Sequence, residues 1–160
     1  MIDKSQLVTA LVQQLEVDLD LQMRAAMMAR DEATNAESRA KSKWDTRGQE
    51  AAYLAAGQAK LAEELGHAIA VYRTMTLPDT RPPARLQVGS VCTIECAGGN
   101  LHGFIGPRTG GTQFVVADVT YTVVTPASPL GRAVLDHRAG ETVYLVARGK
   151  PQPHRIVATF

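Results

Sequence analysis

Two cysteines and four histidines are the side chains best suited to nucleophilic or metal chemistry, but their spacing favours neither. Cys92 and Cys96 are four residues apart in a predicted strand, so at ~3.3 Å per residue they lie about 13 Å apart and cannot form a disulfide. A metal site would need further ligands, and His102 alone does not supply them. No Ser-His-Asp, Cys-His, P-loop or Rossmann pattern is present. We therefore expect ordinary thiols, no intrinsic catalytic residues and no stably bound metal or cofactor.

Acidic side chains form a second group of candidates, and they are mixed with bases between residues 31 and 50. The acids are Asp31, Glu32, Glu37, Asp45 and Glu50, and the bases are Arg39, Lys41, Lys43 and Arg47. Carboxylate oxygens are the ligands that hard cations such as Mg²⁺ prefer, whereas nearby lysines and arginines oppose a bound cation. The segment is therefore mixed in charge rather than plainly acidic.

Two long amphipathic helices are predicted on either side of this charged segment. Apolar positions recur in alternating steps of four and three, which is the pattern of a coiled-coil seam. The first seam is Val8, Val12, Leu15, Leu19, Gln22 and Ala26. The second seam is Leu54, Gln58, Leu61, Leu65, Ala68 and Tyr72. Helices at about residues 4–30 and 45–75 are each about 40 to 45 Å long at ~1.5 Å per residue, with a tip at residues 31–43.

Each of these helices has one apolar stripe, so each needs a partner. An antiparallel hairpin within one chain predicts a monomer, whereas a plain dimerisation coiled coil has the same periodicity and predicts a dimer. The periodicity leaves both open, and the molecular mass in solution distinguishes them.

The hydrophobic period changes in the second half of the chain. Residues 77–86 contain prolines and are predicted to link a helical domain at 1–76 to a β-rich domain at 87–160. Strands are predicted at 88–96, 101–106, 142–149 and 154–160, with one or two more within 112–126. Ser128 and Pro129 predict the cap and first residue of a two-turn helix. The expected fold class is α+β, an N-terminal antiparallel helical hairpin followed by a small antiparallel sheet with one short helix.

The segment Val124 to Thr142, VTPASPLGRAVLDHRAGET, closely resembles the signature of the C-terminal domain of the GreA/GreB transcription elongation factors. In that family a strand ends in Ser-Pro-Leu-(Gly or Ala)-Arg-Ala-Leu-Leu and a Gly-Asp/Glu turn follows. The order of hairpin, linker and sheet is similar over nearly the whole chain. The resemblance implies an FKBP-like sheet that docks on the secondary-channel rim of RNA polymerase through Ser128, Pro129, Leu130 and Arg132. A purely structural role, with Ser128 as a cap and Leu130 in the core, stays open.

The same resemblance implies a function for the hairpin tip. In cleavage-stimulating Gre factors two tip carboxylates help to hold the second Mg²⁺ of the polymerase, which activates water to cut backtracked RNA. The family pattern, Asp-x-x-Glu-Asn-Ala-Glu-Tyr, is nearest to residues 45–53, DTRGQEAAY. Whether the pattern is aligned on Asp45 or on Tyr53, this chain lacks at least one of its first two acids. Asp45 and Glu50 are the acids implied. On a regular helix they are about 140° apart, so joint coordination needs an irregular turn, which Gly48 permits.

Charge and composition favour a protein partner. The formal net charge is +1, which does not predict the basic surface of an independent DNA or RNA binder, although the resemblance is compatible with contact to the 3′ end of nascent RNA. The acidic, amphipathic start does not resemble a signal peptide, and no apolar run reaches the roughly 20 residues of a membrane span. We expect a cytoplasmic protein without a membrane partner.

Three functions remain open at this point. The first is a Gre-like factor that is not itself an enzyme and that assists the polymerase in cleaving backtracked RNA. The second is a non-cleaving or inhibitory secondary-channel regulator, closer to Rnk-like members of the family. The third is an FKBP-like prolyl isomerase or chaperone, which needs an aromatic-lined pocket. The spacing of the aromatic residues does not assemble such a pocket from Phe104, Phe114, Tyr121, Tyr144 and Phe160.

Overall fold

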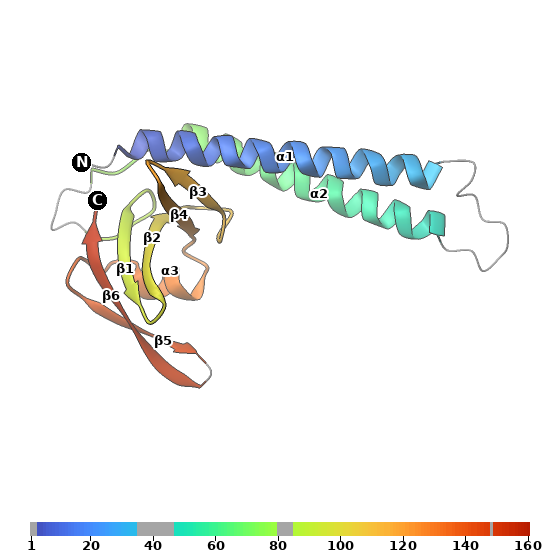
Figure 1. Ribbon diagram of the computed structural model, residues 1–160. Coiled ribbons are helices and arrows are strands. Elements are labelled where there is room, and N and C mark those ends of the chain that lie inside the picture. The colour runs from blue at the N-terminus through green and yellow to red at the C-terminus, as the bar shows by residue number, and fades with distance from the viewer. Residues whose placement is uncertain (1–2, 35–46, 80–84, 148) are drawn as a thin grey trace. The chain divides into compact units, whose positions relative to one another are not determined.

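The structure is a computed structural model, and it describes residues 3–34, 47–79, 85–147 and 149–160. Two long helices, α1 (Lys4–Thr34) and α2 (Arg47–Thr74), precede a β-rich half that contains one short helix, α3 (Pro129–Val134) (Figure 1). The strands are β1 (Val91–Cys96), β2 (Gly99–Ile105), β3 (Gln113–Val116), β4 (Val119–Val124), β5 (Thr142–Ala147) and β6 (Lys150–Thr159). The predicted α+β class, a helical hairpin followed by a small sheet with one short helix, is confirmed.

The chain divides into two compact units. One unit is Val12–Tyr72, which contains most of both long helices. The other unit joins Met1–Leu11 to Arg73–Phe160. Within it, Nζ of Lys4 donates a hydrogen bond to the backbone oxygen of Pro78 (2.8 Å). The first turns of α1 therefore group with the β-rich half of the chain.

Helix α1 begins at an aspartate cap and continues past its predicted end. Oδ1 of Asp3 accepts hydrogen bonds from the backbone N–H groups of Ser5 (2.9 Å) and Gln6 (3.4 Å), two donors that the first helical turn leaves free. The predicted tip starts at residue 31, but α1 extends to Thr34, because residues 31–34 include no helix breaker even though they lack large apolar side chains. The rest of the predicted tip lies outside the described residues.

The buried face of α1 agrees with its predicted seam. The seam positions from Val8 to Ala26 are all buried or half-buried, and Leu15 is completely buried. The same steps continue to Ala29, which is also buried. Apolar residues off this face, such as Met28, are exposed.

The buried face of α2 differs from the prediction in the first half of the helix. Leu54 and Leu61 are predicted seam residues, yet they are 56% and 47% exposed. The buried stripe instead runs through Ala51, Ala55 and Ala62, which are buried or half-buried. The predicted and observed stripes have the same period, and the prediction assigned the larger leucine side chains to the buried one. Small residues allow two helices to approach more closely, so a buried stripe of alanines suits close packing of the helices.

The six strands form one sheet in the order β3-β4-β2-β1-β6-β5. Neighbouring strands are antiparallel except β2 and β4, which are parallel, so the expected antiparallel sheet contains one parallel pair. β3 and β4 are joined by a two-residue turn at Ala117 and Asp118, whose φ angles of 49° and 63° are those that a type I′ turn requires. The segment 112–126, which the sequence left as one or two strands, therefore forms two.

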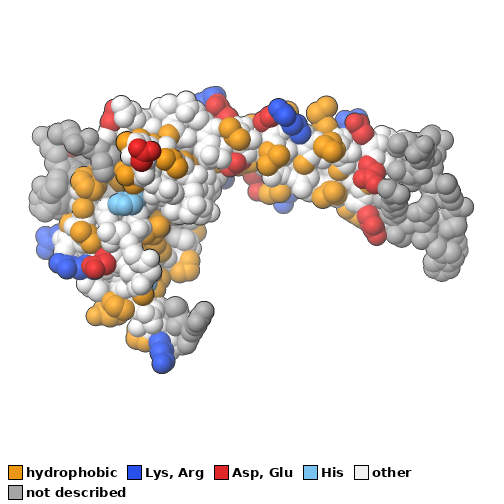
Figure 2. All heavy atoms as spheres, viewed as in Figure 1, with side chains coloured by type: hydrophobic (Ala, Val, Ile, Leu, Met, Phe, Trp, Pro, Cys, Tyr) orange, Lys and Arg blue, Asp and Glu red, His pale blue; other side chains and the backbone are white. Residues whose placement is uncertain are grey.

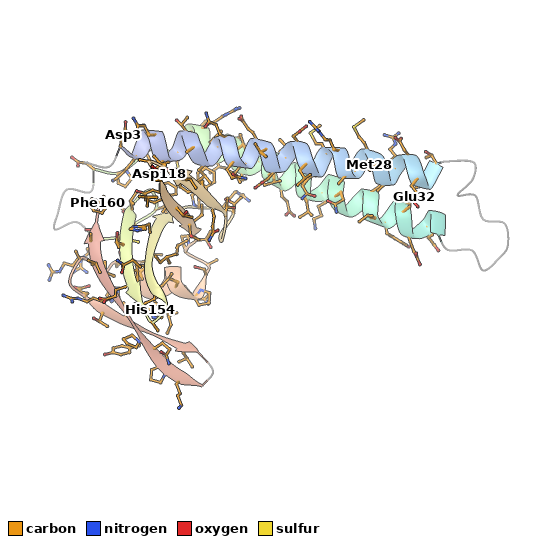
Figure 3. The ribbon with its side chains drawn as sticks, viewed as in Figure 1. Asp3, Met28, Glu32, Asp118, His154 and Phe160 are labelled. Carbon is orange, nitrogen blue, oxygen red and sulfur yellow. The ribbon has the colours of Figure 1, made fainter. Side chains whose placement is uncertain are left out.

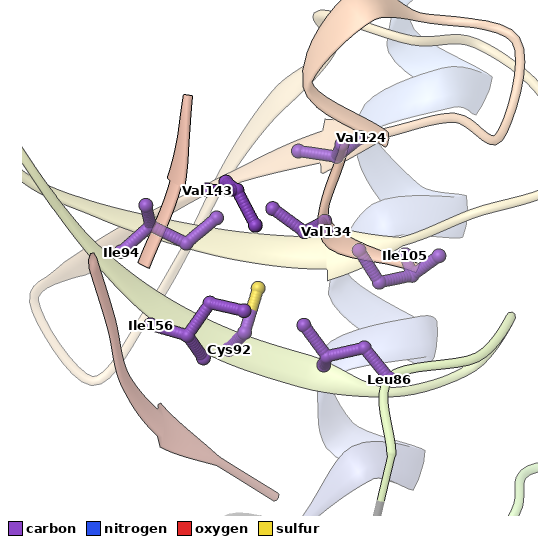
Figure 4. Packing of buried hydrophobic residues seen from close by; sticks show 8 residues of the cluster. All are labelled: Leu86, Cys92, Ile94, Ile105, Val124, Val134, Val143 and Ile156. Atoms are coloured by element: carbon purple, nitrogen blue, oxygen red, sulfur yellow. The ribbon is translucent and has the colours of Figure 1, made fainter. Parts of the chain in front are cut away.

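The central strands β1 and β2 bury part of each face. One face of the sheet packs against α3 through a cluster that Figure 4 shows from close by. This core cluster is Leu86, Cys92, Ile94, Ile105, Val124, Val134, Val143 and Ile156. Side chains alternate along a strand, so Phe104 points to the opposite face from Ile105, and Phe104 is also completely buried. The chain thus has a core on each side of β2.

Strand β6 begins at Lys150, four residues before its predicted start. The prediction treated KPQP as a loop, because proline interrupts a strand that needs its N–H groups. In the structure Pro151 and Pro153 pair with Val146 and Tyr144 of β5. β1 pairs with β6 only from Arg155 onward, so no strand needs the missing N–H groups on the other side of these prolines.

The two helices provide a test of the buried stripe. Leu15→Ala is expected to lower the free energy of unfolding by about 2–5 kcal/mol, because it leaves a cavity at a completely buried position. Leu61→Ala is the matched control and is expected to change it by less than about 0.5 kcal/mol, since that side chain is 47% exposed. Urea denaturation followed by circular dichroism measures both. Equal losses from the two variants would contradict the stripe described above.

Candidate functional site

Helix α3 begins with a cap built from the Ser-Pro-Leu-Gly sequence. Oγ of Ser128 accepts a hydrogen bond from the backbone N–H of Gly131 (3.0 Å) and donates one to the backbone oxygen of Thr125 (2.7 Å). That oxygen also accepts the backbone N–H of Ser128 (3.0 Å). Pro129 occupies the first helical position. The predicted cap and short helix are confirmed.

Gly131 is the residue that lets α3 lie against the end of β4. A Cβ atom at this position would be 1.9 Å from the backbone oxygen of Thr125 and 3.0 Å from Oγ of Ser128. A methyl group at this position would therefore collide with the backbone unless the helix shifted. Sequence reasoning missed this requirement. The available signal was a glycine inside a helix, where it costs about 1 kcal/mol relative to alanine and therefore calls for a packing reason.

The four predicted docking residues lie on α3 or its cap, and they differ in exposure. Ser128 is half-buried and engaged in the cap, and Leu130 is partly buried against the core cluster. Pro129 and Arg132 are exposed. Nη1 of Arg132 donates a hydrogen bond to the backbone oxygen of Ala127 (2.9 Å), which holds the guanidinium near the start of the helix. The docking role itself stays a prediction, and Pro129 and Arg132 are the residues that a partner can reach.

The turn that leads from α3 into β5 is held by a short-range ion pair. Oε2 of Glu141 accepts the backbone N–H of Arg138 (3.1 Å), and its Oε1 lies 3.2 Å from Nε of the same arginine. The backbone hydrogen bond, with the help of the guanidinium, lowers the pKa of Glu141 below its usual value. The turn thus presents a stably ionised carboxylate at neutral pH.

The predicted tip acids are only partly described. Asp45 lies outside the described residues. Glu50 is exposed in the first turn of α2, and Glu32 is exposed near the end of α1, where Figure 3 labels it beside Met28. Neither acid lies on the α3 segment. The proposed role of Asp45 and Glu50 at a magnesium ion therefore stays a prediction.

The two cysteines are buried or half-buried thiols on one strand. Both are free, and both lie in β1. Burial in the core cluster raises the pKa of Cys92 to about 12, and burial also raises the pKa of Cys96. Gly103 makes room for the thiol, since a Cβ there would be 3.1 Å from Sγ of Cys92. Both thiols pack in or against the core cluster, and their burial disfavours the nucleophilic thiolate form.

The described part of the chain contains neither a metal-binding cluster nor a membrane-spanning helix. No group of three or more His, Cys, Asp or Glu side chains in residues 3–34, 47–79, 85–147 and 149–160 is placed to hold a metal ion. No helix in those ranges combines the length and hydrophobicity that crossing a membrane requires.

The aromatic side chains of the sheet pack mainly against one another. The Phe114 ring stacks on Tyr121 at 5.7 Å between centroids and meets Phe104 edge-on at 6.5 Å. All three are buried, whereas Tyr144 is 67% exposed on β5. An isomerase pocket needs aromatic side chains that line an open cavity, and three of the five candidates are instead packed inside the protein.

Solved structures similar to the chain include GreA factor homolog 1 of Thermus thermophilus, at 20% identity over 93% of this chain and 94% of that one, with a TM-score of 0.37. Its Thermus aquaticus counterpart has 20% identity over 92% of both chains and a TM-score of 0.38. The GreA/GreB elongation factor from Nitrosomonas europaea has 18% identity over 64% of this chain and 78% of that one, with a TM-score of 0.34. No protein-family model and no curated protein matches the chain. At these values the similarities assign neither a family nor an activity.

The α3 cap gives a stability prediction. Gly131→Ala is expected to destabilise the protein by about 1–3 kcal/mol, because the new methyl group meets the Thr125 oxygen and the helix must shift away. Ser128→Ala is expected to cost about 1 kcal/mol through loss of the cap. The control Gly66→Ala, at a helical glycine with open space around it, is expected to be neutral or stabilising. Thermal unfolding measures all three, and an unaffected Gly131→Ala variant would disprove the close contact.

The thiols give a prediction of reactivity. At pH 8 a thiol with a pKa of about 12 is ionised to about one part in 10⁴, so iodoacetamide is expected to leave Cys92 unmodified in the folded protein. Cys96, which is only half-buried, is expected to react first. Peptide mass spectrometry after timed alkylation distinguishes the two, and both are expected to react in denaturant. Rapid modification of Cys92 without unfolding would contradict the buried position.

Proposed function

We propose that the chain is a Gre-like factor that binds RNA polymerase and places its helical hairpin in the secondary channel. The observation that carries the proposal is the Ser-Pro-Leu-Gly-Arg-Ala segment, which resembles the Gre signature and forms a capped helix. The cap and Gly131 leave Pro129 and Arg132 exposed side by side on this helix. Arginine and proline presented on a rigid element form a small surface suited to a protein partner.

The hairpin supports the second part of the proposal. Helices of 31 and 28 residues are about 45 Å long at ~1.5 Å per residue, much longer than a sheet of this size needs for its core. The stripe near their far ends consists of small residues such as Ala29 and Ala51, so it buries little apolar surface there. A long element that adds little to the core is consistent with a role in reaching a distant site.

The tip of the hairpin has two alternative functions in the secondary channel. Asp45 and Glu50 support cleavage of backtracked RNA if they help hold a magnesium ion of the polymerase. The departure of residues 45–53 from the two-acid pattern and the bases around them favour the alternative, a factor that occupies the channel without stimulating cleavage. Both outcomes require the same docking step, which is therefore the step to test first.

Docking is tested with purified bacterial RNA polymerase and two variants. Arg132→Glu is expected to weaken binding at least tenfold, about 1.4 kcal/mol, with little change in the unfolding midpoint because the side chain is exposed. Arg108→Glu, at an exposed arginine between β2 and β3, is the charge-matched control and is expected to bind normally. Fluorescence anisotropy of the labelled factor measures both. Absence of polymerase binding by the unmodified protein would refute the proposal.

The tip is tested by transcript cleavage in backtracked complexes. If the factor stimulates cleavage, Asp45→Asn and Glu50→Gln are each expected to reduce the cleavage rate at least tenfold without weakening docking, because only the magnesium ligands are lost. Lys43→Gln is a control that removes a nearby charge of the opposite sign. Binding without any stimulation by the unmodified protein would assign it the non-cleaving role.

A further inference from the structure

Strand β5 is an edge of the sheet that pairs with one neighbour only. The order of strands places it last, next to β6, and among the described residues no strand pairs with its other side. An edge strand presents free backbone N–H and C=O groups, which readily pair with another extended chain. Its inner face is anchored, because Val143 belongs to the core cluster that also contains Val134 of α3.

The other open edges are blocked in ways that β5 is not. β3, at the opposite end of the sheet, is only four residues long. The part of β6 that extends beyond β1 has Pro151 and Pro153, which cannot donate hydrogen bonds to an added strand. By contrast, the six residues of β5, TVYLVA, include no proline, glycine or charged side chain. Short length, proline and charge are the usual protections of an edge, and β5 has none of them.

The prolines also identify the free backbone groups of β5. Proline lacks an N–H, so Pro151 and Pro153 occupy positions whose backbone faces away from β5. In an antiparallel pair, residues directly opposite such positions also face away from their partner. Val146 and Tyr144 are these opposite residues, so their N–H and C=O groups point to the open side of the sheet.

The exposed face of the β5–β6 ribbon is apolar and aromatic. Tyr144 and Val146 are 67% and 77% exposed, and Pro151 and Pro153 beside them are exposed as well. Val157, further along β6, is 49% exposed. Figure 2 shows hydrophobic side chains at the surface where Figure 1 draws this ribbon, together with basic side chains and an acidic one beside them. An added strand would find side-chain contacts here in addition to backbone hydrogen bonds.

The charge of the ribbon indicates what kind of strand fits it. Residues 142–159 contain three Lys or Arg and no Asp or Glu, and Glu141, which directly precedes them, forms an ion pair with Arg138. Lys150 and Arg155 are both exposed. A second copy would bring the same cations together, and pairing of two six-residue strands is small compared with the more than ~1,000 Å² of a stable interface. An acidic segment of another protein is complementary instead.

We propose that β5 binds an extended acidic segment of a protein partner as an added strand, through the outward backbone groups of Tyr144 and Val146. The apolar side chains of that segment pack on the exposed face of the ribbon, and its carboxylates lie near Lys150 and Arg155. This surface is separate from the α3 residues of the proposed polymerase contact, so either proposal can fail without the other.

The test uses the full chain and synthetic peptides of alternating valine and glutamate, with a valine–lysine peptide of equal length as the control. NMR titration is expected to shift the amide signals of Tyr144 and Val146 and to slow their hydrogen exchange at least tenfold at saturation. The valine–lysine peptide is expected to bind at least fivefold more weakly, because it meets like charges. No binding by the glutamate peptide, or equal binding by both, would overturn the proposal.

Two variants separate edge pairing from other modes of binding. Val146→Pro removes an outward N–H opposite an existing proline, so it is expected to keep the fold and abolish peptide binding. Val115→Lys, at a residue 60% exposed on β3, is expected to bind normally. Should Val146→Pro unfold the protein, Val146→Lys provides the same block through charge. Unchanged peptide binding by the edge variants, self-association through β5, or a single-stranded RNA oligonucleotide displacing the peptide would each refute the assignment.

Discussion

The backbone oxygen of Thr125 is the point on which the position of α3 depends. It accepts two hydrogen bonds from Ser128, and it stands where a side chain on Gly131 would otherwise be. The short helix can therefore lie against the end of β4 and bury Val134 among the strands. The same contact determines which residues are exposed, since Pro129 and Arg132 face outward only because the rest of the turn is held inward. The proposed docking surface is thus a consequence of core packing.

Burial of apolar side chains decreases along the helical hairpin. Its stripe is rich in leucine and valine near the start of α1, where Leu7, Leu11 and Leu15 are completely or almost completely buried. Toward Ala29 and Ala51 the stripe becomes small, and larger apolar residues lie on exposed faces. Buried apolar surface contributes about 25 cal/mol per Å². The hairpin is therefore stabilised less near Ala29 and Ala51 than near Leu7, Leu11 and Leu15. The part of the hairpin around Ala29 and Ala51 therefore contributes little to the stability of the fold.

The edges of the sheet differ in how they are protected against pairing with another chain. Pro151 and Pro153 protect one edge at no cost to the ladder, because their nitrogens face the open side of β6. β5 lacks such protection, and its partner strand β6 contains the cations Lys150 and Arg155. Exposed edge strands promote aggregation, so an unprotected edge with a defined charge is more readily explained by a binding role than by chance.

Much of this architecture follows from the sequence alone, because helix caps, helix periods and strand alternation are local properties. The Ser128 cap, the presence of two long helices and the order of elements were all readable in this way, although α1 continues past its predicted end. The buried stripe of α2 was not, since Leu54 and Ala55 fit the same period and only a neighbouring helix decides which is covered. The β6 prolines and the Gly131 contact depend in the same way on which strand or carbonyl lies opposite. Local chemistry determined the elements of this protein, and tertiary neighbours decided which of their faces became core, exposed surface and open edge.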